Sequence, residues 1–135
     1  MAALTKDRQT PERSGKEFSF PVKASTQIFA GSIVVLAAGL AEPGKAATGL
    51  IAVGRAEAHA DNRNGGNGDI DVPVRAGVFR FDNSASADLI TRADIGADAW
   101  IVDDQTVAKT DGSAARSKAG RIVDVDDLGV WVQLG

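Results

Sequence analysis

Short β-type runs separated by turn residues follow one another from Phe18 to the end of the chain. Several of them alternate apolar and polar residues, as in GDIDVPVR at positions 68–75, which is the period of a strand with one buried face. Runs of this length and spacing are typical of small sandwiches and barrels, and not of βαβ units. We therefore expect a mainly β fold, as a small β-barrel, β-sandwich or β-tulip-like domain.

Three local features refine the expected strands. The run SIVVL at positions 32–36 is continuously apolar, which predicts a strand covered on both faces. Pro73 cannot donate to a ladder, so its strand is expected at a sheet edge or at a bulge. Ala76-Gly77 is expected to turn the chain back into a hairpin that returns through positions 78–81.

Two further hairpins are expected in the last third of the chain. One turns around Asp103-Asp104, and the other is RIVDVDDLGVWVQL. In the second, alternation places Val130, Val132 and Leu134 on one face, and Trp131 and Gln133 on the other. The chain ends on this strand, so its C-terminus is predicted to be held in the sheet.

The segment SASADLITRADIG interrupts the β pattern and predicts one short helix. A serine can cap its start, and Asp88 lies in the first turn. Leu89, Ile90 and Ala93 would share one side, and Gly96 follows the expected end.

Residues 1–17 are predicted to form a flexible arm. They mix charged residues with Thr, Ser, Pro and Gly and show neither helical nor strand periodicity. An arm of this kind either has no role or becomes ordered against a partner. The expected organisation is therefore an arm at 1–17 and a single β-rich domain at 18–135.

Composition excludes several classes of function. The chain has 135 residues, no cysteine and a formal net charge of −3. It therefore forms no disulfide and no cysteine-based zinc site, and neither a global positive field nor a cluster of Lys and Arg interleaved with aromatic residues attracts nucleic acid. No run of about 18 apolar residues and no signal peptide is present, so we expect synthesis in a cytoplasm and no membrane contact.

The stretch GLAEPGKAAT at 39–48 comes close to a nucleotide-binding P-loop. A working P-loop places Ser or Thr after the lysine, to hold Mg²⁺, and then begins a helix. Here Ala46 follows Lys45, and the residues after it read as a strand. Pro43-Gly44 instead suits a type II turn between two strands, with Gly44 at positive φ.

Other candidate sites also have a simpler explanation. DNRNGGNGDID at 61–71 and DVDDLG at 124–129 lack the ligand order of a calcium loop, so exposed loops are expected there, with a weak, nonspecific cation site as the alternative. His59 is the one histidine, and the Asp pairs at 103–104 and 126–127 fall at predicted turns. We expect no catalytic residues, no metal and no cofactor.

Almost the whole chain resembles the capsid cement, or head decoration, proteins of tailed bacteriophages and prophages. The resemblance rests on MAALTKDRQTPERSG, IFAGSIVVLAAGLAEPG, TGLIAVGRAE, VRAGVFRF, ADIGADAWIVDDQTVAKT and AGRIVDVDDLGVWV. It implies a structural protein of the virion, often a homotrimer, that binds the major capsid protein on the outer surface of the shell. In lambda-type members an N-terminal segment becomes ordered on the shell and extends a capsid sheet.

Carried to this chain, the resemblance implies that the segment from Thr5 to Arg13 contacts the capsid. The residues concerned are Thr5, Lys6, Asp7, Arg8, Gln9, Thr10, Pro11, Glu12 and Arg13. The expected function is thus capsid decoration without a small-molecule substrate. Two alternatives remain, a head–tail joint or tail component, and a small hydrolase that uses His59 or an Asp pair.

Overall fold

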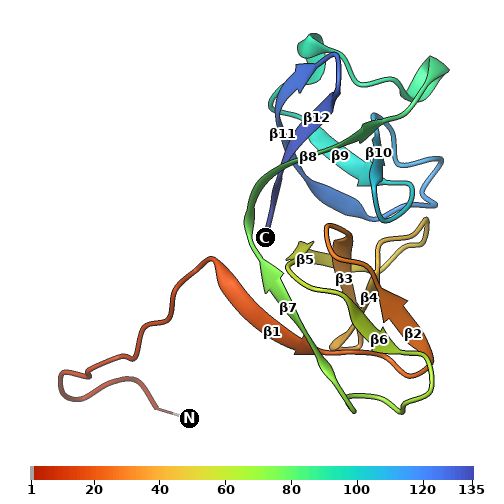
Figure 1. The fold of residues 1–135 in the computed structure, drawn as a ribbon. Coiled ribbons are helices and arrows are strands. Elements are labelled where there is room, and N and C mark those ends of the chain that lie inside the picture. The colour runs from red at the N-terminus through yellow and green to blue at the C-terminus, as the bar shows by residue number, and fades with distance from the viewer. Residues whose placement is uncertain (1) are drawn as a thin grey trace.

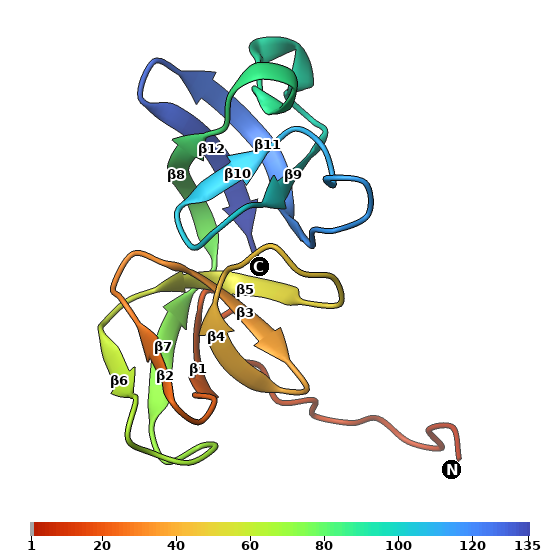
Figure 2. The ribbon, with the colours of Figure 1, turned by 90° about the vertical axis from the view of Figure 1, so that its right-hand side faces the viewer.

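The computed structural model describes residues 2–135, and these fold into two β-rich units stacked end to end (Figures 1 and 2). We call residues 17–75 the N-terminal unit and residues 77–134 the C-terminal barrel. The N-terminal unit contains β1 (Glu17–Pro21), β2 (Thr26–Ile28), β3 (Ile33–Ala37), β4 (Leu40–Pro43), β5 (Ile51–Ala56), β6 (Ala60–Asn62) and β7 (Asp71–Arg75). The C-terminal barrel contains β8 (Gly77–Asn83), η1 (Ser86–Asp88), η2 (Arg92–Asp94), β9 (Asp98–Ile101), β10 (Thr106–Ala108), β11 (Lys118–Asp126) and β12 (Gly129–Leu134).

The N-terminal unit is an antiparallel sheet in the order β1-β7-β5-β3-β4. The sheet curls, because a parallel bridge from Val22 to Ala41 brings the chain after β1 beside β4. The short pair β2-β6 forms a separate two-stranded sheet, and Asn62 at its end is buried and donates from its amide to the carbonyls of Val22, Lys23 and Gly66. The core of this unit consists of Val22, Ile28, Val34, Ala41, Ala56, Ala60, Val72 and Val74.

The C-terminal unit is a closed barrel in the order β10-β8-β12-β11-β9, which confirms the mainly β fold and the barrel among the expected forms. Four of its strand pairs are antiparallel, and the parallel pair of β8 and β10 closes it. Val130, Val132 and Leu134 are fully buried inside, so the predicted faces of β12 are confirmed. The hairpins at Asp103-Asp104 and at Asp126–Gly129 are confirmed as well.

Strand β3 supplies side chains to both hydrophobic cores. Ile33 and Val35 belong to the core of the C-terminal barrel, whereas Val34 belongs to the core of the N-terminal unit. All three are fully buried, which confirms the strand covered on both faces. The two units are therefore packed through one shared strand and not only through a linker.

The predicted turn at Pro43-Gly44 is wrong. The tight turn lies at Ala38-Gly39, where φ is +51° and +80°, and it joins β3 to β4. Two consecutive residues at positive φ are the requirement of a type I′ hairpin turn. Pro43 instead ends β4, and Gly44 is absent from the residues at positive φ within 2–135.

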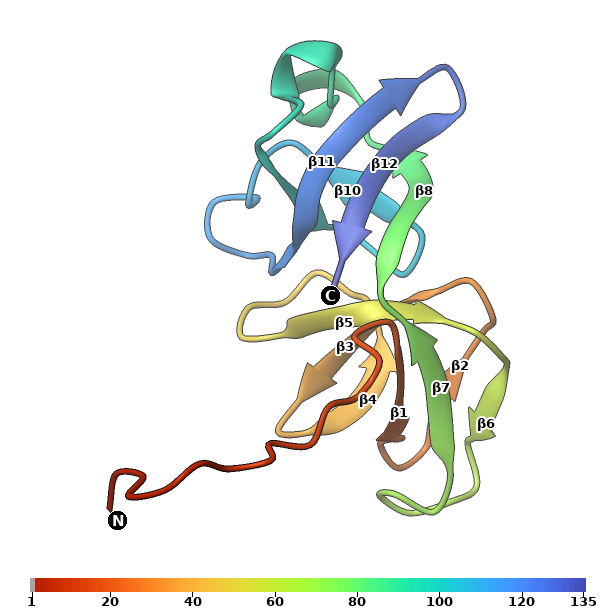
Figure 3. The same ribbon diagram turned by 90° about the vertical axis from the view of Figure 1, so that its left-hand side faces the viewer.

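The predicted hairpin at Ala76-Gly77 is also wrong. Strand β7 passes through Ala76 into β8, which leaves the N-terminal unit and pairs with β12 in the barrel (Figure 3). Nor is Pro73 on an edge strand or at a bulge, because β7 lies between β1 and β5 and its register has no shift. The carbonyl of Pro73 accepts from the backbone N–H of Glu57, just beyond β5. The nitrogen of Pro73 points to the same side, where the ladder between β5 and β7 has already ended, so no partner requires an N–H there.

The predicted helix is replaced by two separate 3₁₀ turns, η1 and η2. Between them the side chain of Asn83 both donates to the carbonyl of Ile90 and accepts from its backbone N–H. These two hydrogen bonds hold residue 90 out of a helix, and the Ile90 side chain enters the barrel core. Leu89, expected on the same side as Ile90, is exposed instead.

Candidate interaction surfaces

The segment that precedes β1 extends away from the rest of the molecule (Figures 1 and 3). We call residues 2–16 the arm, and every one of them is exposed and outside any strand or helix. The nine predicted capsid contacts, Thr5 to Arg13, all lie in it. Leu4 is exposed over 72% of its surface, so the arm presents an apolar side chain together with its charges.

The arm joins the body at an ordered point. Arg13 places its guanidinium carbon 5.7 Å from the centre of the Phe18 ring, and that ring stacks on Phe20. The carbonyl of Lys16 accepts from the backbone N–H of Ala76 at 2.7 Å. The direction in which the arm leaves is therefore set by the junction between β1 and the passage from β7 to β8.

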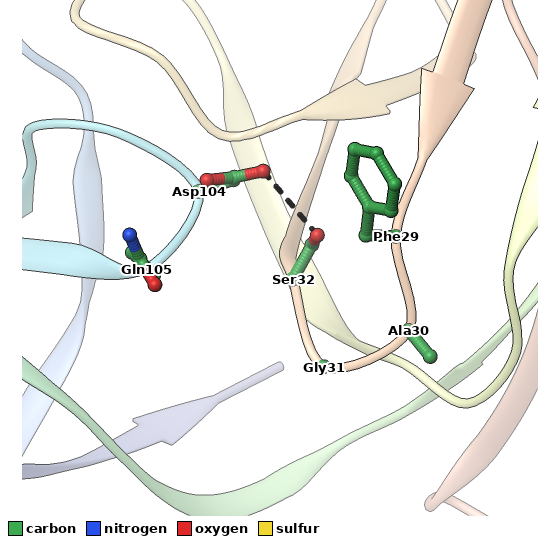
Figure 4. A pocket seen from close by; sticks show the side chains of 6 residues that line it. All are labelled: Phe29, Ala30, Gly31, Ser32, Asp104 and Gln105. Carbon is green, nitrogen blue, oxygen red and sulfur yellow. Dashed lines mark hydrogen bonds between the residues drawn. The ribbon is translucent and has the colours of Figure 1, made fainter.

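A pocket of 420 Å³ lies at the seam between the two units (Figure 4). The loop Phe29–Ser32 forms one wall, and Asp104 and Gln105 from the β9–β10 turn form the other. The Ser32 hydroxyl donates to Asp104 Oδ2 at 3.4 Å, and the carbonyl of Asp104 accepts from the N–H of Ile33 at 2.8 Å. These bonds tie the units together, so Ser32 and Asp104 already have a structural use.

His59 is exposed just before β6. Its ring stacks on Phe29 with centroids 5.3 Å apart, and its Nε2 lies 2.7 Å from the amide nitrogen of Gln27. The structure of residues 2–135 thus gives His59 an amide as its hydrogen-bond partner and brings no serine or aspartate into a triad with it.

Lys45, the apparent P-loop lysine, forms an ion pair with Glu42, and Lys23 lies 3.8 Å from the same carboxylate. The Glu42 side chain is almost fully buried, so the two lysines neutralise a charge that would otherwise be costly to desolvate. The residues after Lys45 enter strand β5 and not a helix. Residues 39–48 therefore resemble a P-loop in sequence but do not have its structure.

The aspartates singled out in the sequence stabilise loops. Asp126 accepts from the N–H groups of Leu128 and Gly129 and from the indole N–H of Trp131. The Trp131 bond is the main cause that lowers the pKa of Asp126, with the Leu128 N–H second. In the segment at 61–71, a side-chain hydrogen bond from Arg63 lowers the pKa of Asp61 to about 2.

No group of three or more His, Cys, Asp or Glu side chains in residues 2–135 is arranged to hold a metal ion. In the same part of the chain, no helix has the length and apolar character that a membrane span needs.

A groove of 600 Å³ that the sequence did not predict runs across β5, β8 and β12. We call it the arginine groove. Arg55 places its guanidinium carbon 4.2 Å from the Phe79 ring centre, and Arg80 places its own 5.6 Å from Trp131. The lining residues are Gly31, Arg55, Val78, Phe79, Arg80, Phe81 and Trp131.

The arginine groove corrects the expectation that no basic residues are interleaved with aromatic ones. VRAGVFRF already alternates Arg75, Phe79, Arg80 and Phe81, and this alternation was the available signal. The contributions of Arg55 and Trp131 could not be predicted, because they depend on how distant strands are placed.

Comparisons of this chain with models of protein families, with curated proteins and with solved structures found no match.

Proposed function

We propose that this chain is a structural protein of a tailed bacteriophage, bound to the outside of the capsid, where it stabilises the shell. The resemblance of almost the full sequence to capsid cement proteins supports this proposal. The structural observation that carries it is the exposed arm, residues 2–16, fixed at its base to the β-rich part of the molecule. Such an arrangement suits a protein that clamps a surface with a segment and covers it with a body.

The arm has the composition of a segment that becomes ordered on a partner. Lys6, Arg8 and Arg13 are exposed and offer charge-assisted contacts, and Leu4 offers an apolar one. An extended segment can add a strand to an exposed sheet edge and gain main-chain hydrogen bonds there. We propose that residues Thr5 to Arg13 make these contacts with the major capsid protein.

Weak individual contacts are sufficient if several arms act together. In a homotrimer, which we include in the proposal, three arms would engage neighbouring capsid subunits at once. The second and third contacts are then intramolecular, and the overall avidity can exceed that of one arm by about two to four orders of magnitude.

Cosedimentation with mature heads that lack the protein tests the proposal. We expect the full chain to bind the heads and to raise the temperature at which they release DNA. A variant without residues 2–12 retains the junction of Arg13, Lys16 and Phe18. It is expected to fold normally but to bind at least tenfold more weakly, because the shared avidity is lost.

Failure of the full chain to bind the heads would overturn the proposal. So would a copy number of about six or twelve per virion, since a ring at the head–tail joint has that stoichiometry. Counting the chain by electron microscopy of the virion distinguishes the ring from shell decoration.

A further inference from the structure

We propose that the arginine groove binds a carboxylate-bearing peptide segment of a partner protein. This proposal goes beyond capsid decoration and does not rest on it, because it concerns the chemistry of the bound segment and not the protein that carries it.

Two aromatic rings orient the two arginines of the groove. The guanidinium carbon of Arg55 lies 4.2 Å from the Phe79 ring centre and that of Arg80 5.6 Å from the Trp131 ring centre, so each guanidinium is held near an aromatic face. Trp131 is itself fixed, because its indole N–H donates to Asp126 at 2.8 Å. An arginine side chain held in this way loses less conformational entropy when it binds a carboxylate than a free arginine side chain does.

The two arginines differ in their own ion pairs. Arg55 pairs with Glu57 at 2.6 Å, but both side chains are about one-third exposed, so the pair is of low stability and can be exchanged. Within residues 2–135, Arg80 forms no ion pair shorter than 4 Å, and its only electrostatic partner is Asp126, whose carboxylate is already bound to Trp131 and whose pKa the Arg80 charge helps to lower. Arg80 is therefore the first anchor that we assign to a bound acidic residue.

A third arginine concentrates positive charge beside the groove. Arg75 on β7 lies directly opposite Arg55 on β5, and residues opposite one another in a ladder share a face. Like charges at directly opposite positions destabilise a sheet. Proteins keep such unfavourable pairs mainly at functional sites. Arg75 itself forms an exposed ion pair with Glu17, at 3.4 Å.

The groove also has an apolar surface. Val78 on β8 is 43% exposed, and Phe79 is only partly buried beside it. A segment in which an apolar side chain lies between acidic ones would fill the groove while its carboxylates reach Arg55 and Arg80.

A single-stranded nucleic acid fits the same surface less well. Its bases need free aromatic faces, whereas guanidiniums already cover faces of Phe79 and Trp131. The carboxylates of Glu57 and Asp126 adjoin the groove, and the chain has a net charge of −3. A continuous phosphate backbone would meet this negative field, whereas a peptide can match separate guanidiniums with separate carboxylates.

An NMR titration of the full chain tests the proposal. The probe is a ten-residue peptide of Asp and Glu with one central Leu, and its matched control has Asn and Gln at the acidic positions. We expect saturable shifts of the Val78 and Arg80 amides and of the Trp131 indole N–H with the acidic peptide only. In the wild-type chain the affinity for the acidic peptide should fall as the NaCl concentration rises. Arg80→Gln should weaken this affinity about tenfold. Arg63→Gln removes the same charge from the distant β6–β7 loop and should leave the affinity unchanged.

Three results would overturn the proposal. The first is the absence of saturable shifts at these residues, and the second is equal binding of the neutral peptide. The third is an oligo-dT that shifts the same signals at lower concentration, which would assign the groove to nucleic acid. None of these results bears on head binding by the arm, so the two proposals fail independently.

Discussion

Gly44 is distinguished by the close neighbours of its α-carbon and not by its backbone angle. A Cβ at this position would lie 3.2 Å from the carbonyl oxygen of Asp103 and from Ile101 Cγ2, and 3.3 Å from Ile33 Cβ. The glycine thus allows the end of β4 to approach the β9–β10 turn of the barrel. The same residue that suggested a phosphate-binding loop in the sequence is a contact between the two units.

Gly44→Val is expected to lower the free energy of unfolding by about 1–3 kcal/mol, because the added atoms overpack this contact. Urea unfolding followed by circular dichroism measures the change. Gly15→Val is the matched control, since nothing lies within 4 Å of the corresponding Cβ, and its effect should stay within about 0.5 kcal/mol. Equal stability of the Gly44 variant and the wild type would contradict the close approach.

Asp126→Asn is expected to lower the melting temperature at pH 7 and to have less effect at low pH. The folded protein lowers the pKa of Asp126 below its ordinary value of 3.8, mainly through Trp131. This stabilisation is present above the pKa of the unfolded chain and is lost as the pH falls through the lower pKa of the folded state. The difference between wild type and variant should therefore narrow below pH of about 4.

Melting curves of both proteins between pH 2 and pH 7 check this dependence. Asp127→Asn is the control, because the structure of residues 2–135 shows no side-chain hydrogen bond of Asp127. A difference that is independent of pH would refute the role assigned to the ionised carboxylate.

At the scale of elements, the β3–β4 hairpin has an unfavourable residue at its turn. Ala38 is exposed and adopts φ of +51°, a region that costs an ordinary L-residue about 1–2 kcal/mol and that asparagine tolerates better. Ala38→Asn should therefore raise the free energy of unfolding by up to about 1 kcal/mol. Ala46→Asn is the control, because Ala46 is exposed and is absent from the residues at positive φ, and it should not raise the free energy of unfolding. Chemical denaturation of both variants measures the difference.

The elements that could be predicted from sequence are those with local causes. The β11–β12 hairpin follows from alternation on both sides of an aspartate turn, and β3 follows from a continuous apolar run. The predicted helix was wrong, because its residues have helical spacing but Asn83, outside the segment, bonds the backbone of Ile90. The pattern of a segment does not show that a side chain just outside it will bind its backbone.

The partners of strands were harder to predict than the strands themselves. Ala76-Gly77 has the composition of a turn, yet Gly77 pairs with Leu134 near the end of the chain, which draws β8 into the barrel. Composition led us to expect an arm at 1–17; residues 2–16 lie outside any strand or helix, whereas Glu17 begins β1. The arginine groove was not predictable, because Arg55 and Arg80 are brought together only when β8 crosses from one unit to the other.

At the scale of the whole molecule, the two units are expected to unfold in one transition, because β3 belongs to both cores. Val34→Ala removes side-chain volume only from the core of the N-terminal unit and should cost about 2 kcal/mol. Both tryptophans lie on strands of the C-terminal barrel, yet their fluorescence midpoint should shift together with circular dichroism.

Leu128→Ala at the exposed tip of the β11–β12 hairpin is the control and should leave both midpoints unchanged. A Val34 variant in which fluorescence keeps the wild-type midpoint while circular dichroism splits into two steps would show that the units unfold separately.

The shared strand also determines how the body can move under load. To bend the molecule at the seam, Ile33 and Val35 would have to leave the barrel core, and the hydrogen bond from the Ile33 N–H to the carbonyl of Asp104 would break. A hinge needs residues that absorb rotation without such losses, and β3 offers none. We therefore expect a force applied to the arm to pass through β1 and to move the two units together, without bending at the seam.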